Sequence, residues 1–118
     1  MPFENYFDLL KIEFPDLSLL YFQSNHEGYL IDKIQEVGFE SNTGMILNAG
    51  GLSHTSISLR DAVAAVPAPV VEVHISDIYK REAFRAHSFL TEVCKSHFIG
   101  QGLDGYRMAI QWLIENHK

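Results

Sequence analysis

The chain has 118 residues, of which 47% are hydrophobic and 20% charged, and its formal net charge is −6 at pH 7. This size and composition predict one globular domain spanning residues 1–118, and the acidic balance argues against a nucleic-acid partner, because there is no surplus of basic residues to neutralise phosphates. The single cysteine, Cys94, excludes an internal disulfide, and neither a membrane-spanning run nor a secretory leader is recognisable, so we expect a cytoplasmic protein with no membrane partner.

The first third of the chain alternates helical and strand-like patterns. Apolar residues recur at helical spacing over residues 3–14. The run Leu17 to Phe22 is apolar almost throughout, which is typical of a strand covered on both faces. Ser24 and Glu27 fit a capping box at the start of the next helix, and Gly38 is well placed as the C-terminal cap of that helix.

The rest of the chain continues this alternation. Ser53 or Thr55 is suited to cap a helix that carries Ile57 in its apolar stripe. In chain order, the sequence predicts a strand at 45–47, that helix ending near 66, a strand at 70–75, a short helix at 81–89, a strand at 98–99 and a helix at 103–115. The alternation predicts an α/β fold with a parallel sheet and helices on both faces. Because the chain opens on a helix, a first strand of such a sheet is missing from the pattern.

The strand beginning at Val70 carries the most informative pair of side chains. Successive residues of a strand point to opposite faces, so Glu72 and His74 share one face, while Val71 and Val73 share the other. A glutamate at this spacing can hold the imidazole in one tautomer and favour its protonated form, as a general acid requires. From these residues alone, an edge strand with a solvated outer face is the favoured interpretation.

Polar groups follow the predicted strands at the carboxyl ends, where ligands bind in open α/β sheets. Asn48 opens a glycine-rich turn that leads to His54, which taken alone is an exposed loop histidine. Ile75 and Ser76 end the strand that begins at Val70 with two backbone N–H groups and a hydroxyl, and Arg85 follows as a group that can bind oxygen ligands bidentately. Together these groups predict a cleft for a compact, oxygen-rich anion, without defining a reaction.

Several other residues have ordinary interpretations. Asp61 fits a solvated helix face beside Arg60, and the other histidines lack the spacing of metal ligands. The segment from Gly100 to Gly102 is a turn rather than a dinucleotide fingerprint. Cys94 has no base at helical or strand spacing, so a buried, inert thiol is expected.

Four sequence blocks resemble the type II 3-dehydroquinases. The blocks are residues 23–32 (QSNHEGYLID), 46–62 (ILNAGGLSHTSISLRDA), 71–88 (VEVHISDIYKREAFRAHS) and 100–106 (GQGLDGY). They occur in the family's order and span most of the chain. The resemblance implies a flavodoxin-like fold and the shikimate-pathway reaction that removes water from 3-dehydroquinate, through an enolate, to give 3-dehydroshikimate. It also implies that no metal or cofactor is needed.

The resemblance also implies roles for individual residues. His74 matches the acid that protonates the departing hydroxyl, and Glu72 matches the group that orients it. Asn48, His54, Ile75, Ser76 and Arg85 match groups that bind the substrate. Asp61 matches a residue that reaches the site from a neighbouring subunit, because the family forms trimers that assemble into dodecamers.

The family's amino-terminal strand and its loop with a catalytic arginine and a tyrosinate base have no counterpart in the sequence. The tyrosines at positions 6, 21, 29, 79 and 106 match no base motif. We therefore expect an N-terminally shortened dehydroquinase whose activity is impaired. The alternative is a degenerate, non-catalytic paralogue that binds carboxylates or serves assembly. A flavodoxin-like phosphate or flavin binder fits the topology but lacks the hydroxyl-rich phosphate loop.

Overall fold

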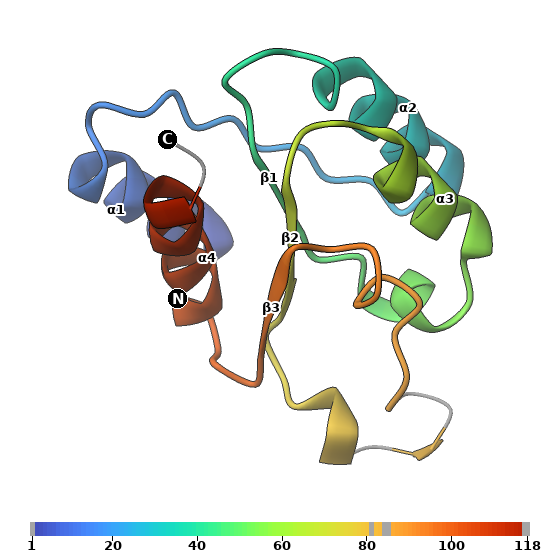
Figure 1. The fold of residues 1–118 in the computed structure, drawn as a ribbon. Coiled ribbons are helices and arrows are strands. Elements are labelled where there is room, and N and C mark those ends of the chain that lie inside the picture. Colours follow the sequence, from blue (N-terminus) through green and yellow to red (C-terminus); the bar gives the residue numbers. More distant parts are fainter. Residues whose placement is uncertain (1, 81, 84–85, 117–118) are drawn as a thin grey trace.

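A computed structural model describes residues 2–80, 82–83 and 86–116 of the chain. In chain order the elements are α1 (Phe3–Glu13), α2 (Glu27–Val37), β1 (Met45–Leu47), the 3-10 helix η1 (Gly50–His54), α3 (Ile57–Ala65), β2 (Val70–His74), the 3-10 helix η2 (Ile78–Lys80), β3 (Ser96–Ile99) and α4 (Asp104–Asn116). The strands form a parallel sheet in the order β1-β2-β3. Helices α1 and α4 cover one face and α2 and α3 the other (Figure 1), which confirms the predicted α/β fold.

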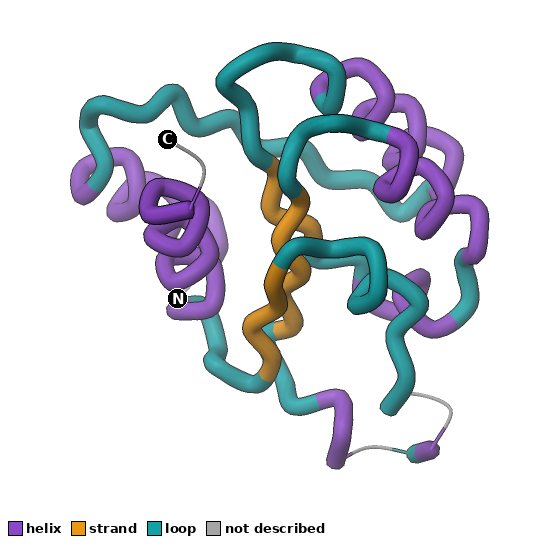
Figure 2. Tube along the Cα trace, viewed as in Figure 1, coloured by secondary structure: helices purple, strands orange, loops and turns teal. Residues whose placement is uncertain are grey.

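Strand β2 lies at the centre of the sheet (Figure 2). It pairs with β1 from Val70 and with β3 from Val71, and all five of its residues are buried. Val71 and Val73 pack with Ala109 of α4, whereas Val70 joins the core under α2 and α3. The interpretation of this strand as a wet edge is therefore wrong, because strands flank it on both sides and helices cover both faces.

Helices α2 and α3 pack closely over the core that Val70 joins. Ile34, Leu59 and Val63 are at most 5% exposed and belong to this cluster. Gly38 follows α2 with a right-handed φ of −66°. A Cβ atom at Gly38 would lie 2.5 Å from the side chain of Val66, so the glycine is required by this close approach rather than by a left-handed cap.

The start of α2 differs from the predicted capping box. The N-cap is His26, which makes no side-chain cap, and the Ser24 hydroxyl instead accepts a hydrogen bond from the His26 N–H at 3.0 Å. The Glu27 carboxylate is used elsewhere, because it accepts a hydrogen bond from the Ser56 hydroxyl at 2.5 Å. This contact ties the start of α2 to the start of α3.

The N-cap of helix α3 lies later in the chain than predicted. Ser56, rather than Ser53 or Thr55, is the N-cap, and its hydroxyl accepts a hydrogen bond from the Leu59 N–H at 2.9 Å. Ile57 is 58% exposed, so its predicted place in the buried stripe is wrong. The N-cap of α3 lies after the predicted positions because the 3-10 helix η1 extends as far as His54.

The predicted strand from Leu17 to Phe22 is not a strand among the described residues. Its side chains alternate as in a strand: Leu19 packs against the α1–α4 cluster, while the Phe22 ring lies 5.0 Å beneath Lys33 of α2. Leu20, however, is 89% exposed. Within the described residues β1 pairs only with β2, and no strand lies beside this segment to form a ladder with it. The prediction was therefore wrong because an apolar run becomes a strand only when a neighbour accepts its hydrogen bonds.

The last third of the chain agrees better with the sequence. Strand β3 is four residues long rather than two, and α4 spans nearly the predicted range. The predicted helix at 81–89 falls partly on residues 81, 84 and 85, which lie outside the described residues, and residues 86–89 are not helical. No helix in the described part of the chain is long and apolar enough to cross a membrane.

Candidate active site

The sheet brings two predicted site segments to one edge. Asn48 follows β1 directly, and His74 is the last residue of β2. Because β1 and β2 are parallel, their carboxyl ends lie side by side at the edge where open α/β sheets bind ligands. The turn after β1 continues into η1, which carries His54.

Glu72 is a buried carboxylate that accepts three hydrogen bonds. It is 0% exposed. Its Oε2 accepts from the His74 Nε2 at 2.6 Å and from the Ser88 hydroxyl at 2.5 Å, and its Oε1 accepts from the Thr91 hydroxyl at 2.6 Å. Burial opposes ionisation, but the hydrogen bonds from His74, Ser88 and Thr91 outweigh it and hold the pKa of Glu72 below its usual value. Glu72 is thus charged at neutral pH.

These contacts fix the imidazole of His74. A carboxylate only accepts hydrogen bonds, so the Nε2 of His74 carries the proton toward Glu72, and Nδ1 remains as the second polar atom of the ring. The His54 ring stacks on the His74 ring with the two centroids 6.4 Å apart and the planes at 20°. His54 Nδ1 lies 2.7 Å from the carbonyl oxygen of His87, which requires a proton on that nitrogen. Hence the sheet and η1 together place two oriented imidazoles near each other.

Asn48 is oriented by two contacts. Its Oδ1 accepts a hydrogen bond from the Gly50 N–H at 3.2 Å, and its Nδ2 donates to the Tyr106 hydroxyl at 2.9 Å. Gly50 has a φ of +57°, a left-handed conformation that glycine adopts without strain. The amide of Asn48 is therefore held in one orientation at the end of β1.

Two tyrosines near this region are poorly suited to act as bases. Burial raises the pKa of Tyr106, although the hydrogen bond from Asn48 partly opposes this effect. Burial raises the pKa of Tyr6 as well, and the neighbouring carboxylate of Asp104 adds to the effect. Both hydroxyls are consequently protonated at neutral pH.

The remaining predicted site residues are Ile75, Ser76, Asp61 and Arg85. Ile75 and Ser76 follow β2 and are exposed, and the carbonyl of Ile75 accepts a hydrogen bond from the Gly102 N–H at 3.0 Å. Asp61 lies on α3 with its side chain 68% exposed and 3.5 Å from Arg60. No described contact joins it to the Glu72–His74 pair. Arg85 lies outside the described residues.

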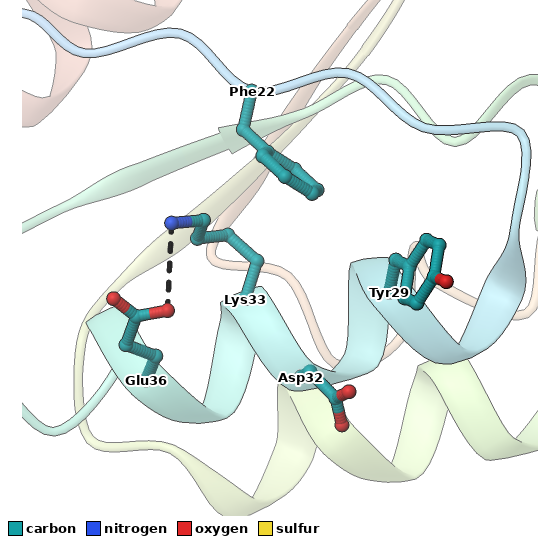
Figure 3. Close-up of a pocket in the computed structure, with 5 residues that line it drawn as sticks. All are labelled: Phe22, Tyr29, Asp32, Lys33 and Glu36. Atoms are coloured by element: carbon teal, nitrogen blue, oxygen red, sulfur yellow. Dashed lines mark ion pairs between the residues drawn. The ribbon is translucent and has the colours of Figure 1, made fainter.

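Cys94 is half-buried rather than buried, and burial together with the charge of Glu72 raises the pKa of its thiol to about 12. Among the described residues, no group of three or more His, Cys, Asp or Glu side chains is arranged to hold a metal ion. An open depression of about 290 Å³ lies elsewhere, along α2 (Figure 3). It contains none of the predicted site residues, and its lining consists of Phe22, Tyr29, Asp32, Lys33 and Glu36.

The residues that sequence reasoning missed are Ser88 and Thr91. They lie 16 and 19 positions from Glu72 in the chain, and neither belongs to a helix or strand. No periodicity relates such residues to a strand. In the sequence, Ser88 belongs to the block 71–88 that carries the family resemblance, but the resemblance assigns it no role.

Comparison with known proteins identifies relatives over most of the chain. The family model for dehydroquinase class II matches residues 4–114. The 3-dehydroquinate dehydratase of Bacillus pumilus is 48% identical over 99 residues, which are 84% of this chain and 67% of the relative. That of Herminiimonas arsenicoxydans is 52% identical over 94 residues, covering 80% and 65%. The chain thus spans about two thirds of the length of these relatives.

Solved structures agree with the sequence matches. The type II dehydroquinase from Butyrivibrio crossotus superposes with a TM-score of 0.91 at 39% identity, over 97% of this chain and 81% of that one. The type II dehydroquinase from Propionibacterium acnes gives a TM-score of 0.75 at 34% identity, over 80% and 68% of the two chains.

Proposed function

Because the chain belongs to the class II dehydroquinase family, we propose that it acts in the reaction for which its relatives are named, the dehydration of 3-dehydroquinate. The product is 3-dehydroshikimate, which makes the protein a hydro-lyase of the shikimate pathway. The observation that carries the proposal is the Glu72–His74 pair, a charged carboxylate that fixes an imidazole at the ligand-binding edge of the sheet.

His74 is the general acid in this proposal. A base removes the proton next to the ketone, and the resulting enolate expels the hydroxyl group on the adjacent carbon atom. The Nδ1–H of protonated His74 donates its proton to that hydroxyl, so that water leaves and the imidazole becomes neutral. Glu72 supports this step by accepting a hydrogen bond from the Nε2–H, which points Nδ1 away from the carboxylate.

The neighbouring polar groups bind the substrate. Asn48 and His54 lie at the end of β1 and in η1, and each is oriented by a hydrogen bond. We assign the substrate carboxylate to the backbone N–H of Ile75 and to Ser76, at the end of β2. Arg85, outside the described residues, is assigned to the ring hydroxyls. No cofactor is assigned.

Asp61 is proposed to serve a site on a neighbouring subunit. Its side chain is 68% exposed on α3, which leaves it accessible to a partner. This assignment requires a homo-oligomer, and we propose the trimer, assembled further into a dodecamer.

The acid and the binding groups are assigned within residues 1–118, whereas no base is assigned. Tyr6 and Tyr106 are protonated at neutral pH, because burial raises the pKa of each hydroxyl. Loss of a general base typically reduces the rate by about 10²–10⁴. Enzymes accelerate reactions by about 10⁶ or more, so slow turnover by this chain is still expected to exceed the background rate.

The test is turnover of 3-dehydroquinate, followed through the ultraviolet absorbance of the conjugated product. We expect slow turnover that His74→Gln removes and that the control His97→Gln, at an exposed position, leaves intact. Turnover that survives His74→Gln would refute the assigned acid. Saturable binding of 3-dehydroquinate in calorimetry, without any turnover, would instead favour the second candidate, a carboxylate-binding or assembly module. The observation that favours that candidate is the raised pKa of Tyr6 and Tyr106, which leaves both hydroxyls protonated at neutral pH.

A further inference from the structure

We propose that Ser88 and Thr91 are positioning residues, whose hydroxyl groups hold the Glu72 carboxylate in place and thereby orient His74. The proposal rests on the function assigned above, because it deepens the role of the Glu72–His74 pair. Ser88 shares Oε2 of Glu72 with His74, whereas Thr91 occupies Oε1 alone. Each of the two oxygens of the carboxylate thus accepts a hydrogen bond from a hydroxyl group.

The hydroxyls are themselves held in place. The Ser88 hydroxyl accepts a hydrogen bond from the Leu90 N–H at 3.1 Å, which leaves its proton for Glu72. Leu90 is 0% exposed, and its carbonyl oxygen accepts hydrogen bonds from the N–H groups of Val93 and Cys94 at 3.1 and 2.9 Å. The two hydroxyls therefore flank a buried residue in a hydrogen-bonded turn, which restricts their movement.

The same turn is connected to the loop that carries His54. The N–H of Phe89 donates to the carbonyl of Ser53 at 2.8 Å, and the His87 carbonyl accepts from His54. Residues 87–91 thus contact Glu72 through side chains and η1 through the backbone. One segment therefore holds both the Glu72 carboxylate and the His54 imidazole in place.

The hydroxyls also keep Glu72 ionised. A carboxylate without donors at a fully buried position would be more basic, and it could take the Nε2 proton of His74 and leave the imidazole neutral, unable to act as the acid. Other titratable groups lie near the pair, namely His54 from η1 and Cys94 from the turn after Leu90. His97 is the register partner of Glu72 on β3, and its side chain is exposed. The partner on β1 is Leu47, which carries no charge.

The proposal is tested by NMR on the 118-residue protein, which needs no substrate. The variants are Ser88→Ala and Thr91→Val, with Thr91→Ser to restore a hydroxyl. The control Thr43→Val removes an exposed hydroxyl that donates only to the Ser41 carbonyl among the described contacts. The readouts are the pH titration of the Glu72 side-chain carboxyl carbon and the resonance of the His74 Nε2 proton. Thermal unfolding is followed in parallel.

We expect Ser88→Ala and Thr91→Val each to raise the pKa of Glu72 by about one pH unit, because each removes one donor. The His74 Nε2 proton resonance should move in both variants, and Thr91→Ser should return both readouts to the parent values. If the melting temperature falls while the Glu72 titration and the His74 resonance stay unchanged, the hydroxyls are merely structural and the proposal is overturned. Thr91→Val is isosteric at a half-buried site, so it keeps the test valid if Ser88→Ala does not fold.

This experiment separates the positioning role from the enzymatic role. A shift of the Glu72 titration together with turnover that survives His74→Gln would retain the positioning residues and reject the assigned acid. Loss of turnover in His74→Gln, with an unchanged Glu72 titration in Ser88→Ala and Thr91→Val, would retain the acid and reject the positioning residues.

Discussion

Replacing Glu72 by glutamine tests the buried carboxylate directly, because it removes the charge and keeps the shape. The parent side chain accepts hydrogen bonds from His74, Ser88 and Thr91. A glutamine has only one acceptor oxygen, and its NH₂ group must face at least one of these donors. The arrangement that conserves most contacts keeps the oxygen toward His74 and Ser88, so that Thr91 has to reverse its hydrogen bond.

The magnitude follows from the nature of these bonds. Hydrogen bonds to a charged acceptor contribute about 1.5–3 kcal/mol, compared with about 0.5–1.5 kcal/mol for neutral pairs. Relief of the burial penalty offsets part of this loss. Since the folded protein holds the pKa of Glu72 below its usual value, the fold favours the carboxylate over a neutral carboxyl group, and glutamine resembles the neutral form. We therefore expect Glu72→Gln to lower the free energy of unfolding by about 1–3 kcal/mol at pH 7.

The pH dependence distinguishes this explanation from a general packing defect. A depressed pKa stabilises the folded protein above the unfolded-state pKa, and this contribution disappears as the pH falls through the folded-state pKa. Urea unfolding of the parent and Glu72→Gln should therefore differ most at neutral pH, and the difference should narrow below about pH 4.3. The control Glu36→Gln, whose carboxylate is exposed and lies 3.4 Å from Lys33, should change stability by less than about 1 kcal/mol. A difference that is constant with pH, or absent at pH 7, would refute the reasoning.

Two further predictions concern the α2–α3 contact and the orientation of the asparagine. Gly38→Ala should destabilise the protein by about 1–3 kcal/mol in urea unfolding, because the new Cβ meets Val66 at 2.5 Å. Gly28→Ala, within α2 and with no atom near its Cβ position, should instead stabilise by about 0.5–1 kcal/mol; equal effects of the two changes would contradict the packing. Tyr106→Phe removes the acceptor for Asn48 and should weaken calorimetric binding of 3-dehydroquinate about fivefold, since one hydrogen bond is lost; unchanged affinity would show that the contact does not orient Asn48.

The part of the site that lies on one strand could be predicted from the sequence. Glu72 and His74 are two positions apart, and the alternation of a strand alone places them on the same face. Burial of that strand could not be predicted, because it depends on β1, β3 and helices from distant parts of the chain. Local pattern therefore gave the geometry of the pair but not its environment.

The parts that could not be predicted depend on tertiary contacts. Ser88 and Thr91 reach Glu72 through a segment without regular structure, so no sequence period relates them to the strand. The segment from Leu17 to Phe22 has the apolar pattern of a strand and still lacks a ladder among the described residues, since pairing requires a neighbour. The N-cap of α3 is Ser56 rather than the predicted Ser53 or Thr55, because η1 ends only at His54.

The central claim is that His74, fixed by Glu72, donates a proton during the dehydration of 3-dehydroquinate. The most direct measurement compares the initial rates of 3-dehydroshikimate formation by the parent, His74→Gln and His97→Gln proteins at equal concentration. The account predicts that His74→Gln lowers the rate by about 10² or more, whereas His97→Gln retains it. Equal rates for the parent and His74→Gln proteins would contradict the account.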